Sequence, residues 1–237
     1  MYYGSYGGYY YGFDWTYLLI IAAFLISLIV QTTMQSTFRK YSRIGSMAGM
    51  TGADVARQIL DSEGLYQVRV IPISGNLTDH YDPRNKTVGL SESVYGQRSI
   101  AALGVAAHEC GHAIQDAQDY VPLRTRSALV PVANFGSQFS WILFFIGLIF
   151  SSQLLCEVGI LLFCLALLFQ LVTLPVEFNA SHRALVKLGN MNLMNRDEVK
   201  GTRKVLTAAA MTYVASVCVS LLYLLRMIIL SGGRRRD

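Results

Sequence analysis

Two histidines and a glutamate stand close together in the segment His108-Glu109-Cys110-Gly111-His112, which matches the pattern H-E-x-x-H. Residues four positions apart on a helix project from the same face, so both imidazoles can bind one ion. Glu109, directly after His108, is placed to reach a water on that ion instead of the ion itself. These residue types support metal-assisted hydrolysis with Glu109 as the general base.

The residues before this motif indicate that it is buried. Residues 100–107 are all small or apolar, and burying polar side chains without partners is costly unless a group such as a metal compensates. The alternative is that the two histidines and the glutamate are ordinary core residues with hydrogen-bond partners. We expect instead one zinc ion per chain.

A catalytic zinc takes three protein ligands and keeps one position open for water, so a third ligand is needed beside His108 and His112. The metzincin pattern would require Gly at position 115 and His at position 118, and both positions hold Gln. The strongest candidate is Glu177, which directly follows an apolar run. Its rivals are Asp116, His80 and His182.

The residues around Glu177 allow two interpretations. Pro175 suits the first turn of a helix, which predicts that a helix begins there and presents Glu177 to the ion. The alternative is that Glu177 forms an ion pair with Arg183 on a solvated turn. Cys110 is turned away from the ion by its position between the histidines, so we do not predict it as a ligand. His80, His182 and Arg183 are candidates for stabilising an oxyanion.

The composition indicates a membrane protein. Hydrophobic residues make up 53% and charged residues 15%, whereas about a quarter of a soluble domain is charged. The first apolar run lacks a basic start and a small-residue cleavage site, so we expect an uncleaved anchor. Four runs are predicted to span a bilayer, at residues 15–31, 135–150, 158–174 and 205–225.

Lys and Arg predict which side of the membrane holds the polar parts. Residues 32–134 contain ten of them and residues 175–204 contain six, whereas the opposite side carries the basic tail at 234–236. The positive-inside rule therefore predicts a multi-pass protein of the cell membrane with its active site on the cytoplasmic side. Arg226, inside the last apolar run, leaves open whether that run crosses fully. The net charge of +5 does not indicate nucleic acid, because the basic residues flank the runs.

The polar part contains local signals for secondary structure. Thr51 followed by Asp54 predicts a helix to about Asp61, and Ser99 to Gln118 is also helix-like. Residues 67–73 predict a strand whose Pro72 suits an edge position. Residues 77–91 predict a hairpin that turns at 82–85.

The expected fold is a mainly α membrane protein with about four transmembrane helices and a small α+β zincin-like domain, forming a single metallopeptidase domain over residues 1–237. The four cysteines lack paired or metal-type spacing and are predicted to be buried hydrophobes.

Several segments resemble the YugP-type family of membrane-bound neutral zinc metallopeptidases, which is related more distantly to the HtpX and CAAX-processing membrane peptidases. The resemblance covers nearly the whole chain, through the Tyr-rich start and the segments 78–83, 90–91, 106–115 and 174–178. It implies a gluzincin-like site in which His108, His112 and a downstream glutamate, Glu177, bind zinc. In HtpX-like relatives an aspartate follows that glutamate four residues later, whereas this chain has Ser181.

The predicted activity is peptide-bond hydrolysis by a zinc-dependent membrane endopeptidase. Its expected partners are a peptide or protein substrate, which includes membrane proteins, and the lipid bilayer. One alternative is a catalytically silent membrane scaffold with a structural zinc site, although a structural site would need no base at Glu109. Another is a small-molecule transporter, but the predicted spans hold few ionisable groups.

Overall fold

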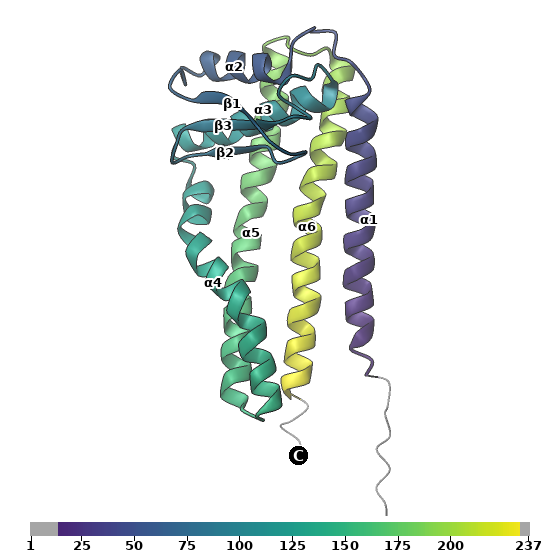
Figure 1. Cartoon of the computed structure of the whole chain (residues 1–237), viewed down its shortest axis with the longest axis vertical. Helices are drawn as coiled ribbons and strands as arrows, with labels where there is room; N and C mark the ends of the chain where they lie inside the picture. Colours follow the sequence, from purple (N-terminus) through teal and green to yellow (C-terminus); the bar gives the residue numbers. More distant parts are fainter. Residues whose placement is uncertain (1–13, 233–237) are drawn as a thin grey trace, which may run out of the picture.

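The computed structural model describes residues 14–232, and the Tyr-rich residues 1–13 and the basic tail at 234–236 lie outside this range. Four long helices run side by side, and a small sheet with two shorter helices covers one end of them (Figure 1). The fold is therefore the predicted mainly α architecture with a small α+β part. The elements in chain order are α1 (Tyr17–Ser42), α2 (Gly52–Ser62), β1 (Arg69–Ile73), β2 (His80–Asp82), β3 (Thr87–Ser91), α3 (Ile100–Ala117), α4 (Val121–Ile149), α5 (Gln153–Asn190) and α6 (Arg196–Gly232).

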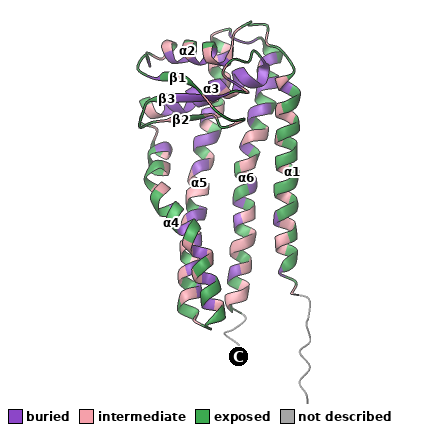
Figure 2. Cartoon of the chain, in the orientation of Figure 1, coloured by how far each residue is buried: buried purple, intermediate pink, exposed green. Residues whose placement is uncertain are grey.

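The helices α1, α4, α5 and α6 are long and apolar enough to cross a membrane. A helix needs about 20 residues to cross the hydrocarbon layer, and these four have 26, 29, 38 and 37 residues. Many of their apolar side chains are exposed, most clearly along α1 (Figure 2). Apolar side chains on the outer face of such a bundle suit contact with lipid, in agreement with the predicted membrane location.

Two local predictions for these helices were wrong. Pro175 does not begin a helix but lies inside α5, which continues without a break. Proline removes one backbone hydrogen bond, and here the packing of α5 against α3, α4 and α6 compensates for that loss. Cys218 on α6 is exposed and Cys164 on α5 is partly exposed instead of buried. The outer face of an apolar helix bundle accepts small apolar residues as well as large ones.

Arg226 lies near the end of α6 that is farthest from the sheet. Its Nε atom donates a hydrogen bond to Oγ1 of Thr16 at 3.2 Å, and its guanidinium group lies 5.0 Å from the centre of the Tyr17 ring. The start of α1 thus provides polar and aromatic partners for this cation.

The polar part contains the predicted elements. Thr51 and Asp54 form a capping box at the start of α2. The sheet has the order β1-β3-β2, with β1 parallel and β2 antiparallel to β3. Pro72 therefore lies on an edge strand, and β2 and β3 form the predicted hairpin. Ser99 caps α3 by accepting a hydrogen bond from the amide of Ala102.

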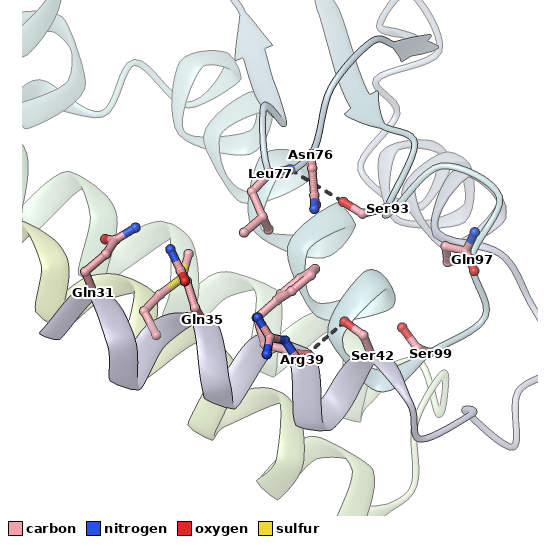
Figure 3. Close-up of a pocket in the computed structure, with 11 residues that line it drawn as sticks. Gln31, Gln35, Arg39, Ser42, Asn76, Leu77, Ser93, Gln97 and Ser99 are labelled. Carbon is pink, nitrogen blue, oxygen red and sulfur yellow. Dashed lines mark hydrogen bonds between the residues drawn. The ribbon is translucent and has the colours of Figure 1, made fainter. Parts of the chain in front are cut away.

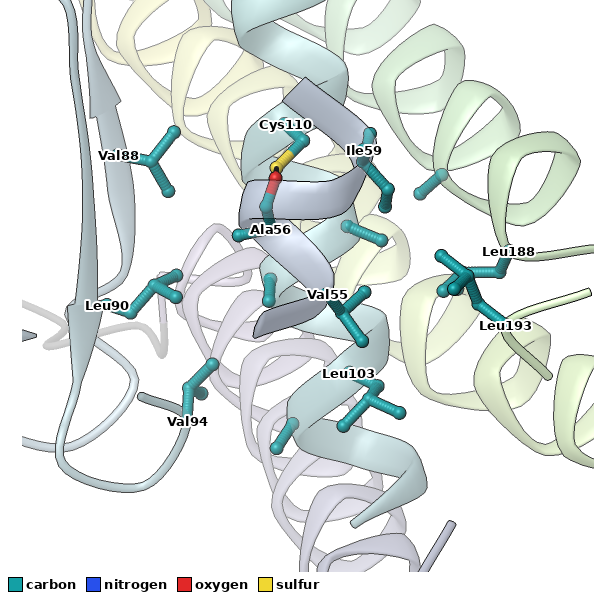
Figure 4. Close-up of a cluster of buried hydrophobic side chains, with 14 of the residues drawn as sticks. Val55, Ala56, Ile59, Val88, Leu90, Val94, Leu103, Cys110, Leu188 and Leu193 are labelled. Atoms are coloured by element: carbon teal, nitrogen blue, oxygen red, sulfur yellow. Dashed lines mark hydrogen bonds between the residues drawn. The ribbon is translucent and has the colours of Figure 1, made fainter. Parts of the chain in front are cut away.

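Helix α3 is the centre of the packed core in this part (Figure 4). Apolar side chains of α2, α3 and β3 meet there and are fully buried, among them Val55, Ile59, Val88, Leu90 and Leu103. On another face of α3, a Cβ atom at Gly111 would lie 2.6 Å from the carbonyl oxygen of Ala180. Only glycine permits this close approach of α3 to α5, and the approach brings the H-E-x-x-H motif next to Glu177.

Candidate metal centre

The side chains of His108, His112 and Glu177 converge where α3 crosses α5. Their potential ligand atoms all lie within 4.8 Å of one another. One carboxylate oxygen of Glu177 lies 3.3 Å from Nε2 of His108 and 3.6 Å from Nε2 of His112. The two histidines come from successive turns of α3, and the glutamate comes from a helix more than 60 residues away in the chain.

These distances fit a zinc ion. Two ligand atoms that each lie about 2.1 Å from a tetrahedral ion are about 3.4 Å apart, which is close to both measured separations. Two imidazoles and one carboxylate are also a donor set of catalytic zinc sites, which keep a fourth position free for water. Among residues 14–232, no second group of three His, Cys, Asp or Glu side chains has comparable geometry.

The rival ligands have other positions or partners. Asp116 accepts hydrogen bonds from the hydroxyl of Tyr81 at 2.7 Å and from Nζ of Lys86 at 2.6 Å. His80 and His182 are both exposed. The thiol of Cys110 faces α2, where Sγ lies 3.5 Å from the carbonyl oxygen of Ala56 (Figure 4).

The proposed ion pair of Glu177 with Arg183 does not occur. Arg183 instead donates hydrogen bonds to Asn179 at 2.7 Å and to Gln118 at 2.6 Å.

Glu109 lies beside the three potential ligands and is not part of their group. Its side chain is buried and lines a cavity of about 810 Å³ together with His108, His112 and Glu177. Burial raises the pKa of Glu109, while the two histidines act in the opposite direction. A raised pKa makes a carboxylate a better acceptor of a proton from water, which suits a general base.

Hydrogen bonds to the second nitrogen of each imidazole orient the histidines. Nδ1 of His108 lies 3.1 Å from the hydroxyl of Ser181, and Nδ1 of His112 lies 3.0 Å from Oε1 of Gln115. Since Oε1 of Gln115 can only accept, His112 carries its proton on Nδ1 and presents the lone pair of Nε2 to the ligand cluster. Nε2 of Gln115 in turn donates to the carbonyl of Val176 at 2.8 Å and to Asn179 at 3.0 Å.

These orienting residues were not predicted from the sequence. Ser181 occupies the position that holds aspartate in HtpX-like relatives, but the sequence alone assigned no role to this serine. The spacing of three residues between His112 and Gln115 is a usable signal, because it places both on one helix face.

Comparison with known proteins shows the family of this chain. The sequence model of a family described as "Putative neutral zinc metallopeptidase" matches residues 16–232. The chain belongs to this family. A relative, "Putative membrane protease YugP" of Bacillus subtilis (strain 168), is 49% identical over 216 residues, which cover 90% of this chain and 96% of the relative. No solved structure matches the chain. The family resemblance inferred from the sequence is thus confirmed.

Two further side chains of this zinc metallopeptidase family member approach Glu177 and were not predicted. A guanidinium nitrogen of Arg126, on α4, lies 3.7 Å from the carboxylate oxygen of Glu177 that does not face the histidines. Tyr213, on α6, lines the same cavity. Of the three residues expected to stabilise an oxyanion, only His80 lines this cavity. Arg126, Tyr213 and His80 can therefore all act as hydrogen-bond donors near the candidate metal centre.

We predict that replacing Gln115 by Leu weakens zinc binding. The change removes the acceptor that orients His112 and the donor to α5. Loss of such an orienting partner typically lowers metal affinity by about 10- to 100-fold. The measurement is a zinc titration against a chelator of known affinity. Gln118→Leu is the matched control, because Gln118 is exposed and contacts Arg183 instead of a histidine. Equal affinities of the two variants would contradict the orienting role.

Proposed function

We propose that this chain is a zinc-dependent endopeptidase that forms a single membrane-embedded domain. The observation that carries the proposal is the position of the buried Glu109 beside a cluster of two imidazoles and a carboxylate, all facing one cavity of about 810 Å³. When bound, zinc supplies a Lewis acid that polarises a carbonyl and lowers the pKa of water. His108, His112 and Glu177 would hold it.

The residues of the chain would divide the remaining work of hydrolysis. Glu109 accepts the proton of the attacking water and returns a proton to the leaving amine. Arg126, Tyr213 and His80 can donate hydrogen bonds to negative charge that develops on the scissile carbonyl oxygen. The strand β2 lies at the sheet edge, and its three residues line the cavity. An extended substrate can therefore add to that edge by backbone pairing.

Loss of activity on metal removal tests this function. We expect the purified protein to cleave an unfolded protein such as casein, to stop when a zinc chelator is added, and to recover when one equivalent of zinc is returned. A silent scaffold with structural zinc would bind the metal but cleave nothing. Cleavage that continues in excess chelator would contradict a metallopeptidase mechanism.

We also propose that the four long helices cross the cell membrane and that the site faces the cytoplasm. Glu177 lies roughly 36 Å along α5 from its start at Gln153, which exceeds the hydrocarbon thickness of about 30 Å. The site would then lie at the membrane surface, on the side rich in Lys and Arg.

Cysteine labelling in intact cells tests this orientation. In a Cys218→Ser background, we expect a membrane-impermeant maleimide to label a Ser151→Cys variant in the turn between α4 and α5. A Glu92→Cys variant in the exposed loop after β3 should react only after the cells are permeabilised. Labelling in the reverse order would contradict the proposed sidedness.

A further inference from the structure

A second cavity lies between α1 and the loops of the polar part (Figure 3). Its volume is about 800 Å³, and we call it the α1 pocket. Eight of the eleven residues that line it have polar or charged side chains. Carboxamide and hydroxyl side chains from α1 and from two loops line it, among them Gln31, Gln35, Asn76, Ser93, Gln97 and Ser99.

A third cavity borders both the α1 pocket and the candidate metal centre. It is a small cavity of about 160 Å³ that shares Met34 and Leu77 with the α1 pocket. The same small cavity is also lined by His108, Glu109 and Glu177. Met34 and Leu77 thus line both cavities, and we call these two residues the neck.

The backbone at this neck is strained. Leu77 has a φ of 56°, in the left-handed region that a residue with a branched apolar side chain rarely adopts. The loop is held in place two residues later, where the carboxylate of Asp79 accepts hydrogen bonds from the amide of Ser91 at 2.7 Å and from its hydroxyl at 2.9 Å. Strain that the surrounding structure maintains in this way is characteristic of functional sites.

The chemistry of the α1 pocket suits a polypeptide segment. Carboxamide groups can both donate to and accept from an extended backbone. Arg39 is the single charged residue in the described lining, and it has no carboxylate partner within residues 14–232. An unpaired guanidinium group at the wall favours an acidic side chain or a terminal carboxylate on the ligand.

We propose that the α1 pocket is a substrate subsite, which binds a polar stretch of polypeptide several residues away from the scissile bond. The substrate passes through the neck at Met34 and Leu77, and an acidic group on it faces Arg39. This inference rests on the proposed peptidase function and adds a substrate class, namely extended chains long enough to reach from the metal centre into the pocket.

Narrowing the neck tests the proposal. An extended peptide advances about 3.3 Å per residue, so a peptide of about four residues stays near the metal centre and one of about twelve reaches the pocket. We expect Met34→Trp to lower kcat/KM for the long peptide at least about tenfold and to leave the short one within about twofold. Ile29→Trp, at an exposed position of α1, is the matched control and should change neither. An equal effect of Met34→Trp on both peptides, or none on the long one, would overturn the subsite.

Reversing the charge of the pocket gives a second, independent readout. We compare two long peptides that carry an acidic or a basic residue at the distal end. The wild type should prefer the acidic peptide and Arg39→Glu the basic one, so that the ratio of the two kcat/KM values changes by about tenfold or more. Arg43→Glu is the control, since Arg43 is exposed one turn later on the same segment and lines neither cavity. An unchanged ratio in Arg39→Glu would contradict the assigned role of Arg39.

A binding experiment separates failure of the subsite from failure of the peptidase function. In a Glu109→Gln, Cys218→Ser background, a Gln35→Cys variant should form a crosslink with a long peptide that carries a thiol-reactive group at its distal end. A Ser36→Cys variant, on the neighbouring and exposed position of α1, should not. Crosslinking at position 35 without cleavage by the wild type would uphold the subsite and refute the peptidase function. Cleavage by the wild type without selective crosslinking at position 35 would uphold the peptidase function and refute the subsite.

Discussion

Glu109→Gln is expected to abolish peptide hydrolysis while zinc stays bound. The amide has the shape of the carboxylate but cannot accept a proton from water, so the general-base contribution of about 10²- to 10⁴-fold is lost. Because Glu109 is not among the converging ligand atoms, the affinity for zinc should remain within a few fold. The measurement combines kcat for a peptide substrate with the zinc content of the same sample.

A matched variant shows whether the effect belongs to the site. Glu92 is exposed in the loop after β3 and does not line the metal-centre cavity, so Glu92→Gln should retain full activity. Undiminished cleavage by Glu109→Gln would refute its role as the base. A loss of zinc together with activity would instead make Glu109 a ligand.

Glu177→Gln is expected to lower the affinity for zinc by more than about 100-fold, beyond the effect of removing an orienting partner. The carboxylate supplies the only negative charge of the proposed ligand set, and its oxygen lies within 3.6 Å of both imidazole nitrogens. A neutral amide is a much weaker zinc ligand than a carboxylate. Zinc competition with a chelator measures the change directly, and activity should fall in parallel.

The control for this variant lies on the same helix. Glu157 is at the opposite end of α5, where it accepts a hydrogen bond from Gln153, and Glu157→Gln should leave the affinity unchanged. Full retention of zinc by Glu177→Gln would remove Glu177 from the ligands. Thermal unfolding of both variants in the absence of zinc checks that the fold is intact.

Local sequence signals were sufficient for much of the fold. The capping pair Thr51 and Asp54, the cap at Ser99 and the turn at 82–85 each determine structure through neighbouring residues, so they are readable without the tertiary structure. The apolar runs likewise predicted four long helices, because about 20 apolar residues are required by the bilayer itself.

The remaining features depend on contacts between distant segments. Helix α5 continues through Pro175 because it packs against neighbouring helices. Helix propensities of single residues do not include such tertiary contacts. Arg126 and Tyr213 lie on α4 and α6, and only the packing of these helices around α5 brings them to Glu177. The H-E-x-x-H spacing located one half of the candidate centre, and the spacing of Gln115 from His112 on the same helix was readable as well. Ser181 contacts His108 only because α3 and α5 pack together.

X-ray absorption spectroscopy of the zinc-loaded protein tests the central claim most directly. With zinc held by His108, His112 and Glu177, elemental analysis of the sample should give one zinc per chain. The spectrum should show a shell of nitrogen and oxygen atoms at about 2.0–2.2 Å, with the outer scattering of two imidazoles. A sulfur shell at about 2.3 Å, a single imidazole, or the absence of stoichiometric zinc would contradict it.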